Sequence, residues 1–201
     1  MIKRRMARQA ERSETTRAAI IDAATQLFGE QGFGETTVDQ IAAAANVAKG
    51  AVYHHFAGKE AIFELVFEAV SAAVARDVAT AGRRAKDALD GIAEGNRAYF
   101  RLCSKEPARR IMLGDGPVVL GWQRWREIDS RHFGAMFPAA LQVAVSQGLI
   151  ADQPVEPLAR LLLGAVTEAA MVCATSPSPS QTMRQYGEAL ERLLSGLRLT
   201  G

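Results

Sequence analysis

The sequence has few of the residues that build metal centres or disulfide frameworks. It holds two cysteines and three histidines among 201 residues. Cys103 and Cys173 fall in different predicted helices and have no metal-like spacing, which favours a reduced, cytoplasmic chain. His54 and His55 are adjacent, and adjacent helical side chains point about 100° apart, so we expect no metal there. No cofactor is expected.

Long apolar runs, secretion signals and catalytic patterns are also missing. No apolar run reaches membrane-spanning length, and the basic N-terminus is not followed by the apolar stretch of a signal peptide. The chain pairs no nucleophile with a base, and it has neither a glycine-rich phosphate loop nor usefully spaced carboxylates. We therefore expect a soluble protein that is not an enzyme and has no membrane partner.

The charge of the chain is small but unevenly placed. The formal net charge is +2, whereas residues 1–17 carry six basic side chains against two acidic ones. A basic arm of this kind is typical of nucleic-acid contact, and a disordered solubilising tail has the same composition. We assign residues 1–13 to a flexible basic arm.

Strand signals are scarce, and apolar residues recur three and four positions apart, so we predict an all-α protein. The first helix is expected over residues 14–31, ended by Gly32. Thr37 and Gln40 form a capping box for the second, Asn46 suits a left-handed turn, and a short third helix spans residues 49–55. A long helix then runs over residues 59–82.

The remaining two thirds of the chain predict further helices. They are expected over residues 85–104, from Pro107, across residues 122–144 with a kink caused by Pro138, and over residues 155–174 and 179–197. The Gly114–Pro117 stretch predicts a turn. Residues 59–201 would then form one helical body.

Residues 36–56 predict two short helices that cross closely at the small residues 42–45. Once the apolar side chains of the second helix are buried, its outward face is short and polar. Its first residues are small enough to approach base edges, and its basic and aromatic side chains can reach phosphates or bases. A threonine at the start of the preceding helix could bind a phosphate through the free backbone amides. This face predicts contact with double-stranded DNA.

The residues Tyr53, His55, Phe56 and Lys59 resemble the helix-turn-helix signature of the tetracycline-repressor (TetR) family, and residues 27–33 resemble the end of its preceding helix. The resemblance implies a three-helix DNA-binding head over residues 14–58 and a C-terminal bundle that binds an effector and dimerises through its last two helices. With the helix start included, the expected DNA-binding residues are Thr36, Thr37, Lys49, Gly50, Ala51, Tyr53, His54 and Lys59. The chain departs from the family at Ala48, where relatives usually carry a serine or threonine, and at Asn46, which replaces the commoner glycine.

Two further sets of residues are candidates in the body. Apolar and aromatic side chains in the middle helices could line an effector pocket, although each of them also suits ordinary core packing. This first set is Phe100, Cys103, Met112, Trp122, Trp125, His132, Phe133, Met136 and Phe137. The last two helices are apolar nearly all round, which favours a subunit interface. This second set is Leu162, Val166, Met171, Tyr186, Leu190, Leu193, Leu194 and Leu197.

The expected function is a homodimeric regulator, by default a repressor, that leaves a near-palindromic operator when an apolar small molecule binds its body. In the alternative, DNA binding is independent of any ligand and the body serves only to dimerise. A stabilising small molecule in a thermal-shift screen would separate the two.

Overall fold

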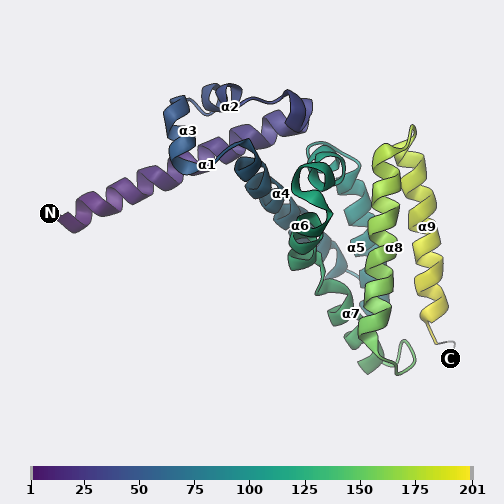
Figure 1. Ribbon diagram of the computed structural model, residues 1–201. Helices are drawn as coiled ribbons and strands as arrows, with labels where there is room; N and C mark the ends of the chain where they lie inside the picture. Colours follow the sequence, from purple (N-terminus) through teal and green to yellow (C-terminus); the bar gives the residue numbers. More distant parts are fainter. Residues whose placement is uncertain (1, 200–201) are drawn as a thin grey trace. The chain divides into compact units, whose positions relative to one another are not determined.

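The computed structural model describes the backbone of residues 2–199 and the side chains of residues 11–199. Within that range the chain is almost entirely helical, and its only pairing outside helices is an isolated antiparallel bridge between Ile150 and Arg198 (Figure 1). The all-α class is therefore confirmed. The chain divides into two compact units, Met1–Ala69 and Val70–Gly201. The division falls inside a helix, beyond the boundary expected at residue 59.

The first unit holds α1 (Ile2–Glu35), α2 (Val38–Ala44), α3 (Lys49–His55) and the start of α4 (Lys59–Gly82). α1 begins well before the expected start near Glu14, so the backbone of the basic arm is helical from Ile2. The arm's side chains up to residue 10 lie outside the described part. Gly32 breaks α1 with a φ of 84°, in the left-handed region where glycine carries no Cβ penalty.

Three phenylalanines hold the first unit together. The ring of Phe63 on α4 meets Phe28 and Phe33 edge-on, with centroids 5.2 Å and 5.3 Å apart. From α2 and α3, Ile41 and Val52 are buried against this core. Because edge-to-face aromatic packing is directional, the cluster helps to hold the helix pair of α2 and α3 in place.

The second unit contains the end of α4 and the helices α5 (Ala88–Cys103), η1 (Arg109–Asp115), α6 (Gly116–Phe133), α7 (Met136–Ser146), α8 (Val155–Thr175) and α9 (Pro179–Leu197). η1 is a π-helix. α8 packs against α9, α7 and η1, and α5 packs against α7 and α9. α8 and α9 run side by side (Figure 1).

The middle of the second unit differs from expectation in two places. The turn expected at residues 114–117 is wrong, because η1 continues directly into α6. The backbone takes a left-handed conformation further on, at Gly121 (φ 73°). The expected kink near Pro138 is a complete break, since α6 ends at Phe133 and α7 begins at Met136. Pro138 thus lies in the first turn of α7, where its missing N–H has no helical acceptor to lose.

α8 also corrects the expectation about apolar length. Val155–Thr175 is long and apolar enough to cross a membrane by length and composition alone. The same helix is a central element of the second unit and carries Glu156, Arg160 and Glu168. A helix that is apolar on most sides and packs against several neighbours needs no membrane to explain its composition.

Candidate functional site

A capping box fixes the start of α2, as the sequence predicts. The Thr37 side chain accepts a hydrogen bond from the Gln40 backbone N–H at 3.2 Å, and the Gln40 side chain accepts one from the Thr37 N–H at 2.8 Å. Two backbone donors that the helix cannot satisfy are thereby paired. The start of α2 is thus held by two hydrogen bonds between residues only three positions apart.

Replacing Thr37 with alanine is expected to lower the free energy of unfolding by about 0.5–2 kcal/mol, because the Gln40 N–H loses its acceptor. Urea unfolding of the full chain measures the change. Thr15→Ala is the matched control, since Thr15 lies inside α1 and only bonds back to the Glu11 carbonyl. An equal loss in both variants would contradict the capping role.

The turn between α2 and α3 is tight. Asn46 takes the left-handed conformation that was expected of it, with a φ of 54°, and the Val47 N–H bonds to the Ala42 carbonyl at 3.0 Å. Ala48 occupies the N-cap of α3 without a side-chain hydrogen bond. The two helices therefore cross as a helix-turn-helix without a hydroxyl at the N-cap of α3.

The outward face of α3 is open to solvent. Lys49, Gly50, Tyr53 and His54 are exposed, and a Cβ built on Gly50 would meet nothing within 4 Å. Tyr53 keeps 53% of its surface, while Ala51 is half-buried. The side chains of this face are small near the start of α3 and polar beyond it, which suits insertion into a major groove.

Lys49 is also linked to α2. Its ammonium lies 2.9 Å from Asp39 Oδ2, and this hydrogen bond raises the pKa of Lys49. The pair is solvent-exposed, so it holds the lysine only weakly. The ammonium stays charged and close to the face of α3.

Two of the expected DNA-binding residues are engaged inside the protein. Thr36 is fully buried, and its hydroxyl donates to the Gly32 carbonyl at 2.7 Å. The Lys59 ammonium donates to the carbonyls of Phe33 and Thr36 at 2.7 Å and 2.8 Å and lies over the Phe33 ring. Thr36 thus presents no side chain to a ligand, and Lys59 ties the start of α4 to the end of α1.

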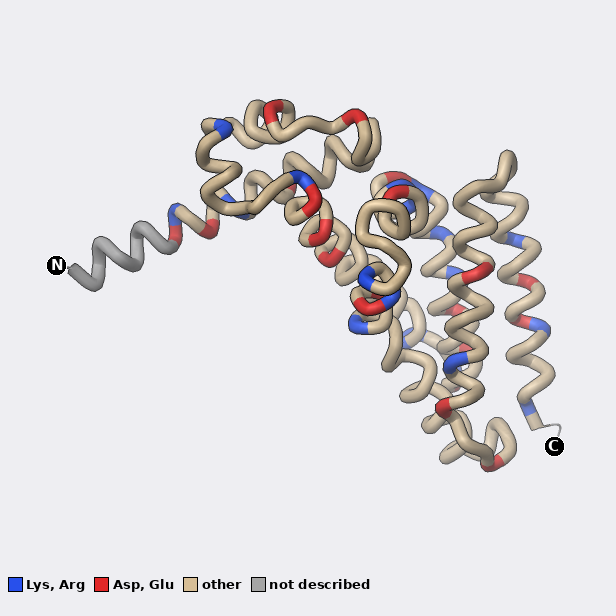
Figure 2. The backbone as a smooth tube through the Cα atoms, in the orientation of Figure 1, with Lys and Arg blue, Asp and Glu red and all other residues tan. Residues whose placement is uncertain are grey.

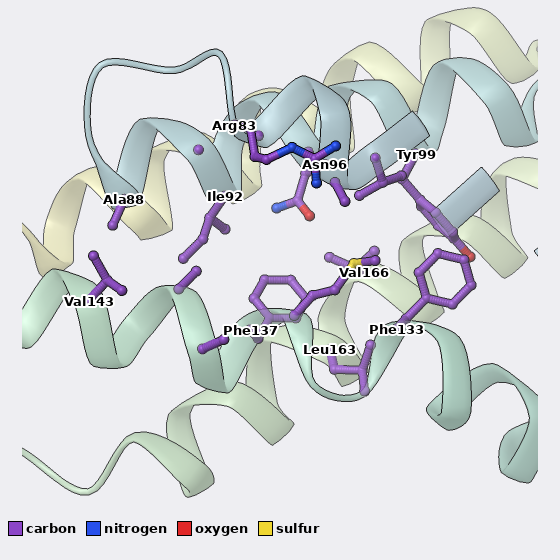
Figure 3. A pocket seen from close by; sticks show the side chains of 18 of the residues that line it. Arg83, Ala88, Ile92, Asn96, Tyr99, Phe133, Phe137, Val143, Leu163 and Val166 are labelled. Carbon is purple, nitrogen blue, oxygen red and sulfur yellow. The ribbon is translucent and has the colours of Figure 1, made fainter. Parts of the chain in front are cut away.

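A cavity of about 510 Å³ opens in the second unit. Its wall comes from the end of α4, from α5, the end of α6, α7 and α8, and it is mostly apolar (Figure 3). Gly82 and Gly91 lie along the wall, and a Cβ on Gly82 would approach the Gly91 carbonyl oxygen to 3.0 Å, so these glycines let the chain pack closely there. Its size and apolar wall are typical of small-molecule sites.

Only three of the nine residues expected at an effector pocket line this cavity, namely Phe133, Met136 and Phe137. Trp125 is buried elsewhere, where its indole N–H donates to the Met112 carbonyl at 2.8 Å. Trp122 is 57% exposed and stacks on Trp125. The remaining candidates, which pack away from the cavity, are Phe100, Cys103, Met112 and His132.

Sequence reasoning missed the polar groups of the cavity. Asn96, Asp129 and Thr167 line it, and each is at least nine-tenths buried. Burial raises the pKa of Asp129 to about 6. A lone polar residue within a helix has no periodicity to mark it, so only the fold reveals that these three line one cavity.

An ion pair anchors the helix start at the edge of the cavity. Asp87 caps α5 by accepting from the N–H groups of Leu89 and Asp90, both at 3.0 Å. Arg198, just beyond α9, donates to both Asp87 oxygens at 2.8 Å and 3.1 Å. These bonds, first those from Arg198 and then those from the backbone, lower the pKa of Asp87 to about 2.

Asp87→Ala is expected to cost about 0.5–2 kcal/mol of unfolding free energy at neutral pH, because α5 loses its cap. The pKa of Asp87 is lower in the folded chain than its ordinary value of 3.8, so the stabilisation is complete above that value and lost as the pH falls towards 2. Urea unfolding from pH 6 down to about pH 2 should show a constant difference above pH 4 and the two proteins converging below it. Exposed Asp152→Ala is the control, and a pH-independent difference for Asp87→Ala would contradict the assignment.

The outer faces of α8 and α9 carry two exposed leucines among polar and charged residues. Leu161 on α8 is 73% exposed and Leu193 on α9 is 59% exposed. A Cβ added to Gly164 or Gly187 would meet nothing within 4 Å. Figure 2 shows few charges along α8. Open glycines beside exposed leucines suit the close approach of another helix.

The eight residues expected at a subunit interface divide into two groups. Leu162, Val166, Leu190 and Leu194 are buried within the chain itself, so they belong to its core. Leu193 is exposed, and the others are half-buried, namely Met171, Tyr186 and Leu197. Leu161 and Gly164 belong to the same apolar stretch of α8, and Leu161 stays exposed because an apolar run does not show which of its faces the chain will cover.

Two family models match the chain. The model described as "Bacterial regulatory proteins, tetR family" covers residues 20–66, and the one described as "Tetracyclin repressor-like, C-terminal domain" covers residues 89–197. A crystal structure of a TetR-family transcriptional regulator from Pectobacterium atrosepticum is similar with a TM-score of 0.85 and 29% identity. It covers 94% of this chain and 97% of that one.

Two curated relatives show how the likeness is distributed. The transcriptional regulator SrpR of Pseudomonas putida is 50% identical over 62 residues, which are 30% of this chain and 29% of SrpR. The A-factor receptor protein of Streptomyces griseus is 26% identical over 203 residues, 98% of this chain and 68% of the relative. The helix-turn-helix, the helical body and these likenesses agree: the chain belongs to the TetR family of DNA-binding transcriptional regulators.

Proposed function

We propose that the chain is a cytoplasmic homodimeric repressor that leaves a near-palindromic operator when a small apolar molecule fills the cavity of its second unit. The observation that carries the proposal is the cavity, because part of its wall is the end of α4. The same helix begins at Lys59, which is hydrogen-bonded to the end of α1 in the first unit. One continuous helix thus belongs to both the cavity and the head.

DNA contact is assigned to the open face of α3. Lys49, Gly50, Tyr53 and His54, with Ala51 beside them, would enter the major groove, and Thr37 would meet the phosphate backbone at the start of α2. Thr36 and Lys59 would act indirectly by holding the end of α1 in place. A single face of this size supplies few base contacts, so one head alone would bind weakly.

Dimerisation is assigned to the outer faces of α8 and α9. Leu161, Gly164, Leu193 and Leu197 would pack against the same residues of a second copy, in an isologous four-helix arrangement. Burying two exposed leucines per chain removes apolar surface from water where the two copies meet. The dimer would place two α3 helices in successive major grooves on one side of the duplex.

Ligand response would follow from linkage between the two sites. A molecule that binds the cavity more tightly when the heads are wrongly spaced shifts the population towards that state. Its effect on operator affinity is limited by its differential affinity for the two states. The 26% identical relative is named a receptor, which is consistent with a body that responds to a small molecule.

The experiment is a footprint on the promoter of the chain's own gene, with purified full-length protein. Protection should be two-fold symmetric, with half-sites about one helical turn apart. An asymmetric footprint over a single half-site would contradict the dimer. A thermal-shift screen on the same protein should find stabilising apolar molecules, and a ligand that binds without changing operator affinity would contradict the linkage.

A further inference from the structure

One buried side chain in the cavity has a hydrogen-bond donor that the protein does not use. Asn96 on α5 is 9% exposed, and its Nδ2 has no hydrogen-bond partner in the structure. Figure 3 shows its amide end directed into the cavity between Ile92, Phe137 and Tyr99. Leaving a buried amide donor unsatisfied costs stability. The cavity therefore has a polar position that a bound oxygen atom would complete.

The charged groups of the wall do not suit an anion beside Asn96. Asp129 is 7% exposed and brings a carboxyl group to the same cavity, and Tyr99 interacts with both Asp129 and Cys103. Arg83 also lines the cavity, but it is exposed to solvent, which screens its charge, and it donates to Thr80 Oγ1 at 3.0 Å. The other charged residue of the wall, Asp87, is held by Arg198. None of the buried residues that line the cavity is basic.

We infer that the cavity takes an uncharged, mostly apolar molecule whose carbonyl or hydroxyl oxygen accepts a hydrogen bond from Asn96 Nδ2. The inference rests on the proposed role of this cavity as the effector site. The aromatic walls from Phe133 and Phe137 cover the apolar body of such a molecule. A carboxylate at the same place would lie in a low-dielectric wall shared with Asp129, without a buried cation to compensate its desolvation.

The test uses a neutral fluorescent probe, N-phenyl-1-naphthylamine, whose emission rises in an apolar site. Three competitors on one two-ring frame displace it from the full-length protein at neutral pH: benzophenone, which has a carbonyl acceptor, diphenylmethane, which has none, and 4-benzoylbenzoate, which is an anion. Benzophenone should displace the probe at concentrations roughly three- to tenfold below those of diphenylmethane, the ratio that one hydrogen bond supplies. The benzoate should be the weakest.

Asn96→Leu replaces the donor with an apolar side chain of similar size. Asn96→Ala removes the donor without adding volume. In both variants, benzophenone and diphenylmethane should displace the probe at nearly equal concentrations. Gln142→Leu is the matched control, because it removes an exposed carboxamide from α7 outside the cavity wall. That variant should keep the preference for benzophenone.

Thermal unfolding without ligand separates a binding role from a structural one. The Tm of Asn96→Leu should equal or exceed that of the unchanged chain, since the replacement removes an unsatisfied buried group. A clearly lower Tm in both Asn96 variants, a benzophenone preference that survives them, strongest displacement by the benzoate, or a probe that does not bind would each overturn the inference. Displacement uses no DNA and the footprint uses no ligand, so failure of this inference is distinguishable from failure of operator binding.

Discussion

Leu161→Arg combined with Leu193→Arg is expected to convert the protein to monomers and to weaken operator binding roughly 10²–10⁴-fold, the range that linked binding sites gain. Both side chains are largely exposed in the single chain, so the substitutions remove little packing within it. In the dimer they would place four arginines where four leucines would otherwise be buried. The folded protomer should survive while the interface does not.

Sedimentation equilibrium measures the mass of this variant, and fluorescence anisotropy with a labelled operator measures its affinity. Gln123→Arg combined with Gln142→Arg is the matched control, because it adds the same charge at exposed positions of α6 and α7. The control should remain dimeric with unchanged affinity. A dimeric Leu161→Arg/Leu193→Arg variant would show that the subunit contact lies elsewhere.

Tyr53→Ala and Lys49→Ala are each expected to weaken operator binding by about 1–3 kcal/mol, the range for one direct contact in a major groove. Tyr53 is the large exposed side chain of α3, and its removal leaves the buried Val52 of the same helix in place. Lys49→Ala should also reduce the slope of log affinity against log salt concentration by about one if the ammonium meets a phosphate.

Anisotropy titrations over a series of salt concentrations measure both effects. Lys105→Ala, an exposed lysine of the second unit, is the control for loss of one positive charge. Urea unfolding confirms that the head stays folded. Operator affinity that is unchanged in both α3 variants would place the DNA contact on another surface.

The head could be predicted in detail because its signals are local. Thr37 and Gln40 cap α2 across three residues. The tight turn after α2 requires a left-handed residue, and asparagine tolerates that conformation at Asn46. The roles of Thr36 and Lys59 could not be predicted, because both depend on carbonyls at the end of α1. A motif identifies a lysine at the start of α4 but does not show which acceptors surround it.

The cavity was hidden from sequence for a different physical reason. Its wall is assembled from residues of α4, α5, α6, α7 and α8, which lie far apart in the chain. Large aromatic residues attract attention in a sequence, but Trp125 fills core space and pairs with Met112. Empty space between helices is a property of packing, which no single segment encodes.

Packing also decides which apolar residues of the last two helices the chain covers. Their apolar composition predicts burial on more than one side, and the chain itself covers Leu162 and Leu190. Leu161, one residue earlier, remains exposed because adjacent helical residues point about 100° apart. The register of α8 against α9 decides which apolar residues remain for a partner.

The central claim is that two copies of this chain, joined through α8 and α9, bind one operator together. Sedimentation equilibrium of the protein with a duplex carrying the footprinted site tests it most directly. The account predicts a complex of two chains, or a whole multiple of two, for each duplex, saturating cooperatively. A saturated complex with one chain for each duplex would contradict it.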